Sequence, residues 1–411
     1  MEVENILHMN TGNGELSYAQ NSLLQEIVIR KSLPVLRHAI KGMANLDIVF
    51  DQCFKIADLG CSSGKNTLFV ASTIIDIVDE VCKENNRKTP QFQVCLNDLY
   101  SNDFNTVFEM LPNFLAKLKK QKGENFGPTF VSAVPGSFYG RLFPDKTLHL
   151  IHSSYSIHWL SQVPEGLHNN KSNIYMAKSS PPNVFDAYQK QFYSDFTKFL
   201  QLRSMEVVCG GRMVLTFVGR SSVDPTSDDG CRHMELLAES LVDLLKEVYS
   251  FPIFKYHPKG LVQESDINSF NLPYYTPCED EVRNVVYNEG SFFLDSLNVF
   301  QGNWDPYDTD YTNIKDFKDN HIHGKNAVQM SHSSCSKIMV FFDGLDVIFD
   351  EHDHHHHRRG DESLIWRLEI EETPLTLLSR WKSLPEYDIY MSGEEGVAGN
   401  KEWRCCEGWD L

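Results

Sequence analysis

Short runs of apolar residues in the first two thirds of the chain are separated by longer stretches in which apolar residues recur at helical spacing. The short runs predict buried strands, and the stretches between them predict amphipathic helices. Strands are expected at 54–59, 92–96, 129–134, 147–152 and 212–218. Helices are expected at 15–45 (one or two helices), 66–82, 187–205 and 234–249, with loops at 135–140 and 180–183. This alternation is typical of an α/β fold with a doubly wound parallel sheet.

Acidic residues dominate the chain, whose net charge is −18 over 411 residues. Such a charge argues against a nucleic-acid partner, because phosphate recognition needs a basic surface. Residues 331–411 hold 17 acidic and 8 basic residues, a net charge of −9, so the last fifth of the chain differs from the rest. That segment includes the histidine run 354–357, which we interpret as a solvated loop that binds metal only adventitiously.

The ten cysteines are scattered and form no CxxC pair, which is typical of reduced thiols. No signal peptide is recognisable at the start, and no apolar stretch approaches the roughly 18 residues that a membrane span needs. We therefore expect a cytoplasmic protein that does not enter a membrane.

A glycine turn follows the first predicted strand, in the sequence Asp58-Leu-Gly60-Cys61-Ser-Ser-Gly64. Glycines let the backbone approach a ligand closely, and the helix that follows offers free N–H groups. The sequence lacks the G-x-G-x-x-G pattern of dinucleotide sites. An acid before the first glycine suits a ligand with a cationic amino group, as in S-adenosylmethionine. The alternative is an ordinary strand-to-helix turn.

Two further groups of polar or aromatic residues follow predicted strands. Asp98 ends the second strand, where a carboxylate can accept hydrogen bonds from two ribose hydroxyls, although such an Asp is often a helix cap. Tyr155, His158 and Trp159 follow the fourth strand and combine apolar surface with O–H and N–H donors. They line a ligand crevice or are ordinary core aromatics.

Taken together, these segments resemble the plant SABATH methyltransferases, which methylate salicylate, benzoate, jasmonate or purine alkaloids. The resemblance is carried by residues 7–9, 12–15, 17–19, 21–22, 57–64, 96–99, 134–144, 153–164, 210–215 and 270–273. It implies a Rossmann-like class I methyltransferase sheet with a helical cap over the active site. It also implies an N-terminal helical segment closing the active site (1–50), an S-adenosylmethionine-binding core with cap insertions (51–329) and an atypical acidic tail (330–411).

The resemblance assigns residues to two neighbouring sites. The cofactor site would contain Tyr18, Asp58, Cys61, Asn66, Asp98, Leu99, Ser137 and Phe138, with Asp58 beside the methionine moiety. The substrate site would contain Gln25, Tyr155, His158 and Trp159. The family resemblance also implies a small carboxylic acid as substrate and a homodimer.

Within the family, the chain is most similar to jasmonate carboxyl methyltransferases. This similarity rests on Asn10, on 130–134, on His158 beside Trp159 and on 224–226. The expected reaction therefore converts jasmonic acid to methyl jasmonate, a step of plant hormone metabolism. The alternatives are a benzoate or salicylate enzyme, a purine N-methyltransferase, and a homologue made inactive by its altered C-terminus. A nicotinamide oxidoreductase is disfavoured by the single-glycine turn.

The sequence departs from the family in three places. Lys65 replaces a proline of the glycine loop. A weak magnesium site would map to Asn170, Phe270 and Asn271, but Asn268 stands where the family has an acid, and magnesium prefers carboxylate and water oxygens. The third departure is the tail 330–411, which does not resemble the helix and last strand of the family. Its apolar runs 337–342 and 363–370 are candidates for a substitute strand.

The predicted reaction needs no general base, because a carboxylic acid with a pKa near ~4 is already ionised at neutral pH. The protein must align the carboxylate with the methyl group that it attacks. We predict that Gln25 and Trp159 are the catalytic residues and hold the carboxylate through the amide and the indole N–H. His158 is expected to shape the pocket rather than to transfer a proton.

Overall fold

The computed structural model describes residues 9–12, 14, 17–44, 52–123, 126–250 and 264–300, together with the short strands Ile348–Phe349 and Leu368–Glu369. No helix within these residues is both long enough and apolar enough to cross a membrane.

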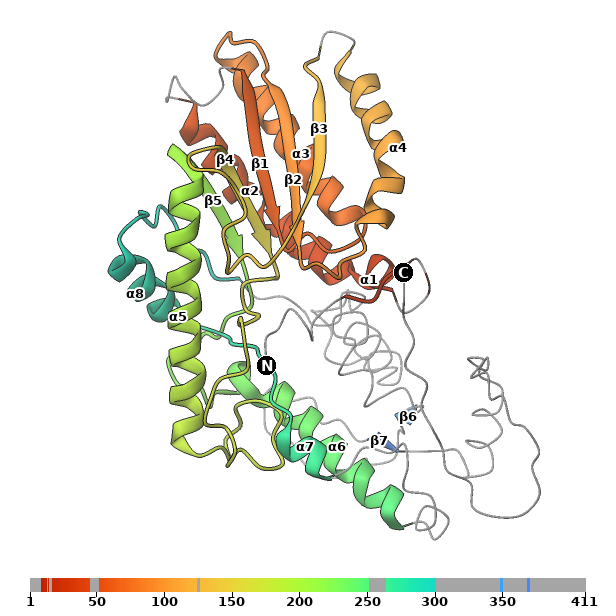
Figure 1. The fold of residues 1–411 in the computed structure, drawn as a ribbon, viewed down its shortest axis with the longest axis vertical. Coiled ribbons are helices and arrows are strands. Elements are labelled where there is room, and N and C mark those ends of the chain that lie inside the picture. Colours follow the sequence, from red (N-terminus) through yellow and green to blue (C-terminus); the bar gives the residue numbers. More distant parts are fainter. Residues whose placement is uncertain are drawn as a thin grey trace, which may run out of the picture. The chain divides into compact units, whose positions relative to one another are not determined.

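The centre of the fold is a five-stranded sheet in the order β3-β2-β1-β4-β5, in which all neighbours are parallel (Figure 1). Its strands are β1 (Cys53–Leu59), β2 (Gln91–Asp98), β3 (Thr129–Pro135), β4 (Leu148–Ser154) and β5 (Val207–Thr216). The order reverses between β1 and β4, which is where a doubly wound sheet forms its ligand crevice. The predicted parallel sheet is confirmed.

Helices cover the two faces of this sheet in different ways. Helices α2 (Leu23–Met43), α3 (Lys65–Glu84) and α4 (Phe104–Lys122) pack on one face, and α5 (Pro182–Glu206) packs on the other. Side chains of β1 alternate accordingly, because Ile56 joins the core under α2 and α3 whereas Ala57 and Leu59 join the core under α5.

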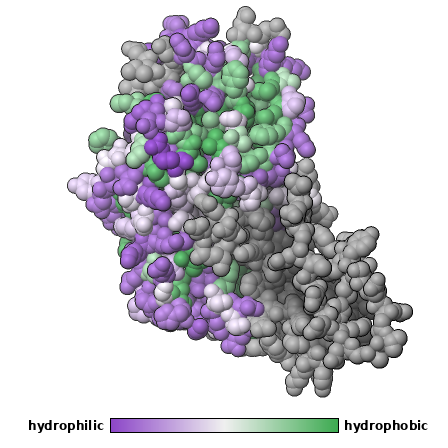
Figure 2. Space-filling model, viewed as in Figure 1, coloured by the Kyte–Doolittle hydropathy of each residue, from purple (hydrophilic) through white to green (hydrophobic). Residues whose placement is uncertain are grey.

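The second face is only partly covered. Phe130 of β3 points away from the α3 side, since its neighbour Val131 packs there, and Phe130 is 56% exposed. Figure 2 shows hydrophobic surface over the part of the molecule where Figure 1 places β1, β2 and β3. The core under α5 is therefore centred on β4 and β5. At β3, part of the same face of the sheet stays exposed and apolar.

Shorter elements complete the described part of the chain. They are α1 (Tyr18–Asn21), the π-helical turn η2 (Asp228–Arg232), α6 (His233–Ser250), α7 (Glu264–Ser269) and α8 (Glu279–Glu289). Helix α8 packs on α5, and α6 contacts both η2 and α7. Ala238 and Leu241 of α6 and Ile267 of α7 share one core with Tyr175 and Tyr274. That these helices form a cap over the active site stays a prediction.

The structure differs from the expected elements in several places. Helices α4, α7 and α8 lie outside the expected helical stretches, and other elements begin or end at different residues. Helix α2 continues through Pro34, so the N-terminal helices divide at Ser22 instead. Helix α5 begins at Pro182, inside the expected loop 180–183, because proline suits the first turn of a helix. Strand β5 begins at Val207 rather than at 212.

The predicted acidic tail 330–411 lies almost wholly outside the described residues. Its two described strands, β6 (Ile348–Phe349) and β7 (Leu368–Glu369), pair antiparallel with each other in a sheet of their own. Strand β7 falls within the apolar run 363–370. The predicted domain bounds at 50 and 329 fall on residues outside the described part and stay predictions.

Candidate active site

The chain turns sharply at Gly60, where β1 ends. Gly60 has φ of 74°, and a Cβ atom added there would lie 2.1 Å from Ser156 Oγ. The amides of Gly60 and Cys61 both donate to the carbonyl of Asn97, which fixes the turn against β2. Helix α3 then begins at Lys65 without a side-chain cap, so its first N–H groups are available to a ligand.

Asp58 lies just before this turn and is buried at 5% exposure. Its Oδ1 lies 2.7 Å from His152 Nδ1, and its Oδ2 accepts a hydrogen bond from Thr67 Oγ1 at 2.6 Å. Both oxygens thus have protein partners, and the carboxylate joins β1 to β4 and α3. The predicted contact of Asp58 with a methionine moiety stays a prediction, while its role in holding the turn is visible directly.

We expect the Asp58–His152 hydrogen bond to stabilise the fold measurably. His152→Leu leaves a buried carboxylate oxygen without its donor and should cost roughly 1–3 kcal/mol of unfolding free energy. His152→Asn retains a side-chain N–H near the position of Nδ1 and should lose less than half as much. Denaturant unfolding of both variants checks this. Equal losses in the two variants would show that the volume of the ring, and not the hydrogen bond, matters.

Asp98 ends β2 beside the same turn. Its Oδ2 accepts from the Ser62 amide at 2.7 Å and its Oδ1 from the Leu99 amide at 2.8 Å. Burial raises the pKa of Asp98 to about 6, and the negative charge of Asp58 acts in the same direction. The side chain caps no helix, since Asp103 caps α4 by accepting from Thr106 N. A carboxylate held in this way at a strand end is suited to a pair of ribose hydroxyls.

The other predicted cofactor residues gather around these two acids. Burial raises the pKa of Tyr18, and the charges of Asp98 and Asp58 raise it further, which shows that the phenol lies near both. Asn66 donates to the Ser22 carbonyl at 3.0 Å and ties α3 to the start of α2. Phe138 approaches the turn, because its Cε1 lies 3.8 Å from a Cβ built on Gly60.

Several buried polar atoms at this turn have no hydrogen-bond partner among the described residues. Three of them, Ser62 Oγ, Ser63 Oγ and Asn66 Oδ1, belong to the turn and the start of α3, and a fourth, Gln25 Oε1, belongs to α2. Buried polar atoms are normally paired, so such a cluster beside a glycine turn is suited to a polar ligand. The residues present therefore fit a nucleoside with an amino-acid side arm.

Aromatic rings form a continuous cluster beyond β4. The His158 ring lies 5.6 Å from the Tyr155 ring, 5.6 Å from the Trp159 ring and 5.1 Å from the Tyr274 ring. Trp159 and Tyr274 also pair as an isolated bridge, with ring centroids 5.3 Å apart. The structure thus brings together the three aromatic residues predicted for the substrate site. Sequence reasoning missed Tyr274, although it directly follows the family segment 270–273.

His158 is neutral in this cluster. Burial lowers its pKa to about 3, and its Nδ1 accepts a hydrogen bond from the Val218 amide at 3.3 Å. The remaining ring nitrogen, Nε2, therefore carries the hydrogen. A neutral imidazole with one nitrogen already engaged is suited to shape a pocket and not to accept a proton.

Gln25 lies in the first turns of α2 and is 9% exposed. It lies three residues after Ser22, whose carbonyl accepts a hydrogen bond from Asn66 at the start of α3. This places the first turn of α2 close to the glycine turn. No hydrogen bond in the described part of the chain joins Gln25 to Trp159. That these two residues hold one carboxylate stays a prediction.

The residues of the predicted magnesium site are close together but do not fit the ion. Asn170 donates to Asn271 Oδ1 at 2.9 Å, and Asn170 Oδ1 itself accepts from Ser180 Oγ at 2.7 Å. Asn268 accepts from the Ser172 amide at 2.9 Å, so it too has a protein partner. Neutral amides engaged in this way lack the carboxylate oxygens that magnesium prefers. The described residues also contain no group of three or more His, Cys, Asp or Glu side chains placed to hold a metal ion.

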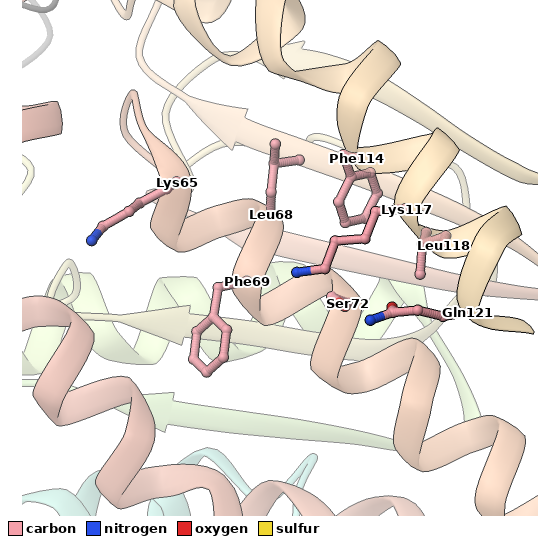
Figure 3. Close-up of a pocket in the computed structure, with 8 residues that line it drawn as sticks. All are labelled: Lys65, Leu68, Phe69, Ser72, Phe114, Lys117, Leu118 and Gln121. Atoms are coloured by element: carbon pink, nitrogen blue, oxygen red, sulfur yellow. The ribbon is translucent and has the colours of Figure 1, made fainter.

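Lys65, which departs from the family, forms an ion pair with Glu26 at 2.9 Å and lowers the pKa of that carboxyl. Its side chain also borders a hollow of about 220 Å³ between α3 and α4, shown in Figure 3. The hollow is lined by Lys65, Leu68, Phe69, Ser72, Phe114, Lys117, Leu118 and Gln121. None of these is a predicted site residue, although Lys65 directly precedes Asn66.

The parallel sheet, the glycine turn and the strand-end carboxylates define a class I methyltransferase that uses S-adenosylmethionine. Comparison with known proteins narrows this class. The chain belongs to the family described as SAM dependent carboxyl methyltransferase, whose pattern matches residues 4–364. This confirms the resemblance to the SABATH proteins, the enzyme class and the methyl donor.

Individual relatives agree with this assignment. The chain is 47% identical to a "Probable jasmonic acid carboxyl methyltransferase 2" of Theobroma cacao, over 74% of this chain and 80% of the relative. It is 48% identical to an S-adenosyl-L-methionine:benzoic acid/salicylic acid carboxyl methyltransferase of Petunia hybrida, over 74% of this chain and 81% of the relative. A solved structure of a loganic acid methyltransferase with SAH is 34% identical, with a TM-score of 0.58, over 69% of this chain and 76% of that one.

Proposed function

We propose that this carboxyl methyltransferase converts jasmonic acid to methyl jasmonate. The supporting observation is the aromatic cluster around Trp159, in which the one imidazole is neutral because its pKa is about 3. A pocket lined by uncharged aromatic rings favours binding of a largely apolar acid. The similarity to a jasmonic acid enzyme favours jasmonate. Benzoic and salicylic acids are the second candidates, because a relative of nearly the same identity carries their names.

The cofactor residues proposed here are those that surround the glycine turn. Asp98 accepts hydrogen bonds from the ribose hydroxyls, Tyr18 and Phe138 supply ring surface, and the amides at the start of α3 face the polar arm of the ligand. Ser137, Cys61, Leu99 and Asn66 complete the site. S-adenosylmethionine supplies a methyl group that its sulfonium makes electrophilic.

Catalysis by the protein consists of orientation and exclusion of water. The acid is already ionised at neutral pH, so no side chain has to remove a proton. Gln25 and Trp159 hold the carboxylate by donating hydrogen bonds that are weaker than an arginine pair would be. The rest of the acid lies among the aromatic rings of Tyr155, His158 and Tyr274. Exclusion of water favours a reaction in which the opposite charges of carboxylate and sulfonium cancel.

Replacing the two side chains that donate hydrogen bonds to the substrate carboxylate should slow ester formation and leave nucleoside binding intact. In Trp159→Ala and Gln25→Ala we expect kcat/KM for the acid to fall roughly 10- to 100-fold, because each loses a donor and the first also loses ring surface. Trp159→Phe keeps a ring without the N–H and should fall between wild type and Trp159→Ala. The measurements are a radiolabelled methyl-ester assay and calorimetry with S-adenosylhomocysteine.

The acid itself is identified by assaying jasmonic, benzoic and salicylic acids side by side with the same methyl donor. Highest kcat/KM with jasmonic acid supports the proposal, and a preference for either aromatic acid replaces it with the second candidate. Unchanged ester formation in both Ala variants would remove Trp159 and Gln25 from the mechanism. The cytoplasmic location and the homodimer stay predictions.

A further inference from the structure

The segment 136–143 follows β3 and carries one residue toward each half of the site. Phe138 approaches the glycine turn at Gly60, on the side proposed for the nucleoside. The next residue, Tyr139, is buried at 7% exposure, and its ring centroid lies 4.8 Å from that of Phe138. The segment therefore places Phe138 beside the glycine turn, while the adjacent Tyr139 reaches the Trp159 backbone, so the chain between them links the two half-sites.

Arg203, near the end of α5, holds the segment 136–143 in place by hydrogen bonds to its backbone. It is completely buried, and its Nη1 donates to the Phe138 carbonyl at 2.7 Å while its Nη2 donates to the Gly140 carbonyl at 2.7 Å. The planar guanidinium presents its donors in a rigid fork, so it fixes two carbonyls that lie two residues apart. Lysine has a single ammonium group and cannot reproduce this spacing.

Glu206 completes the anchor one turn further along α5. It is also completely buried, and its Oε1 accepts from the amides of Leu142 at 2.8 Å and Phe143 at 3.1 Å. Arg203 Nε lies 2.8 Å from Glu206 Oε2, so the charges neutralise each other. Buried ion pairs contribute little net stability compared with apolar residues of similar size. The pair is better explained by the backbone geometry that it enforces.

Tyr139 makes the matching connection on the acid side. Its hydroxyl donates to the Trp159 carbonyl at 2.7 Å. Trp159 is the residue proposed to hold the carboxylate, and its amide is in turn fixed by donating to the Ser156 carbonyl at 3.0 Å. The hydroxyl of Tyr139 thus sets the position of the Trp159 backbone relative to the segment that carries Phe138.

We propose that Arg203 and Tyr139 are positioning residues that couple the two half-sites through the segment 136–143. Arg203 fixes Phe138 against the nucleoside, and Tyr139 fixes Trp159 against the acid. Together they set the separation between the methyl donor and the carboxylate. This inference rests on the proposed function, in that Phe138 and Trp159 are taken to contact the two reactants.

The test uses two variants of the full-length enzyme, each expected to weaken binding of a different ligand. Tyr139→Phe loses only a hydroxyl, so KM for the acid should rise and kcat/KM fall roughly 5- to 10-fold, with the Kd of S-adenosylhomocysteine within about twofold of wild type. Arg203→Lys should raise that Kd roughly tenfold, because one of two carbonyl contacts is lost. If Arg203→Lys does not fold, Glu206→Gln tests the same anchor by removing its charge.

The control is Lys122→Gln, which breaks a partly buried ion pair with Asp79 (2.8 Å) on the opposite face of the sheet from α5. It should lower Tm without changing either binding constant. The inference is overturned if Tyr139→Phe leaves the acid constants unchanged, or if both test variants merely reproduce the control. If the wild-type enzyme esterifies no acid of the panel, the proposed function fails. The Kd shift in Arg203→Lys then still decides whether the anchor acts on the nucleoside side.

Discussion

Gly60→Ala should weaken binding of S-adenosylhomocysteine by at least about 100-fold. The added methyl group would lie 2.1 Å from Ser156 Oγ and 2.5 Å from Ser156 Cβ, and it would also impose a left-handed conformation on a residue with a side chain. Left-handed backbone costs roughly 1–2 kcal/mol and overpacking roughly 1–3 kcal/mol, so the turn must shift to relieve both. Calorimetry with the demethylated nucleoside measures the loss.

Two matched variants separate the clash from the backbone strain. Gly166 also has a positive φ, of 84°, but nothing lies within 4 Å of an added Cβ. Gly166→Ala should therefore show the strain in its unfolding free energy and leave nucleoside binding unchanged. The double variant Gly60→Ala with Ser156→Gly removes both clashing atoms and should regain most of the affinity. A Gly60→Ala protein that binds as tightly as Gly166→Ala would refute the close approach at this turn.

Asp98→Asn should also reduce the affinity for S-adenosylhomocysteine, by roughly 100-fold. An asparagine has one acceptor oxygen where the aspartate uses two, toward the amides of Ser62 and Leu99. Its amide group would face a backbone N–H, and the charge that strengthens hydrogen bonds to hydroxyl groups would be lost. Asp103→Asn serves as the control, because Asn still caps α4 and nucleoside binding should stay within twofold.

The same carboxylate predicts how binding depends on pH. Burial raises the pKa of Asp98 to about 6, so a proton competes with the nucleoside below that value. Because the ligand hydroxyls require the ionised form, affinity should be constant above pH 7 and fall roughly tenfold by pH 5. The Asp98→Asn variant should lack this dependence. An affinity that is flat from pH 5 to 8 in the wild-type protein would show that Asp98 does not bind the hydroxyls.

The parallel core was predictable because its strands are short apolar runs that end in turn residues. For this reason the apolar pattern predicts β1 and β2 to within two residues of their observed ends. It does not predict the start of β5, because Gly210 and Gly211 interrupt the apolar pattern there. The structure accommodates them through a positive φ of 79° at Gly210 and a register shift opposite Leu148 and Leu150. Such an irregularity depends on the neighbouring strand and leaves no periodic signal in the sequence.

The candidate site likewise has features that the sequence predicts and features that it does not. Asp98 and the aromatic residues after β4 follow strand ends, and parallel strand ends meet at one edge of a sheet, so their proximity could be inferred. The partner of Asp58 could not, because His152 lies 94 positions further along and meets it only through the register of β1 with β4. Arg203 was equally invisible, since 65 positions separate it from Phe138 and its sequence context is that of an ordinary amphipathic helix.

Tyr155 belongs to the aromatic cluster of the proposed substrate site and also lowers the stability of the fold. It has φ of 60°, and its amide donates to the Thr216 carbonyl at 2.7 Å, so β5 holds the residue in a conformation that suits glycine or asparagine. The backbone at this position costs roughly 1 kcal/mol or more. Substitutions that improve heat tolerance here would delete part of the ring wall. Engineering for robustness and engineering for turnover are therefore opposed at this residue.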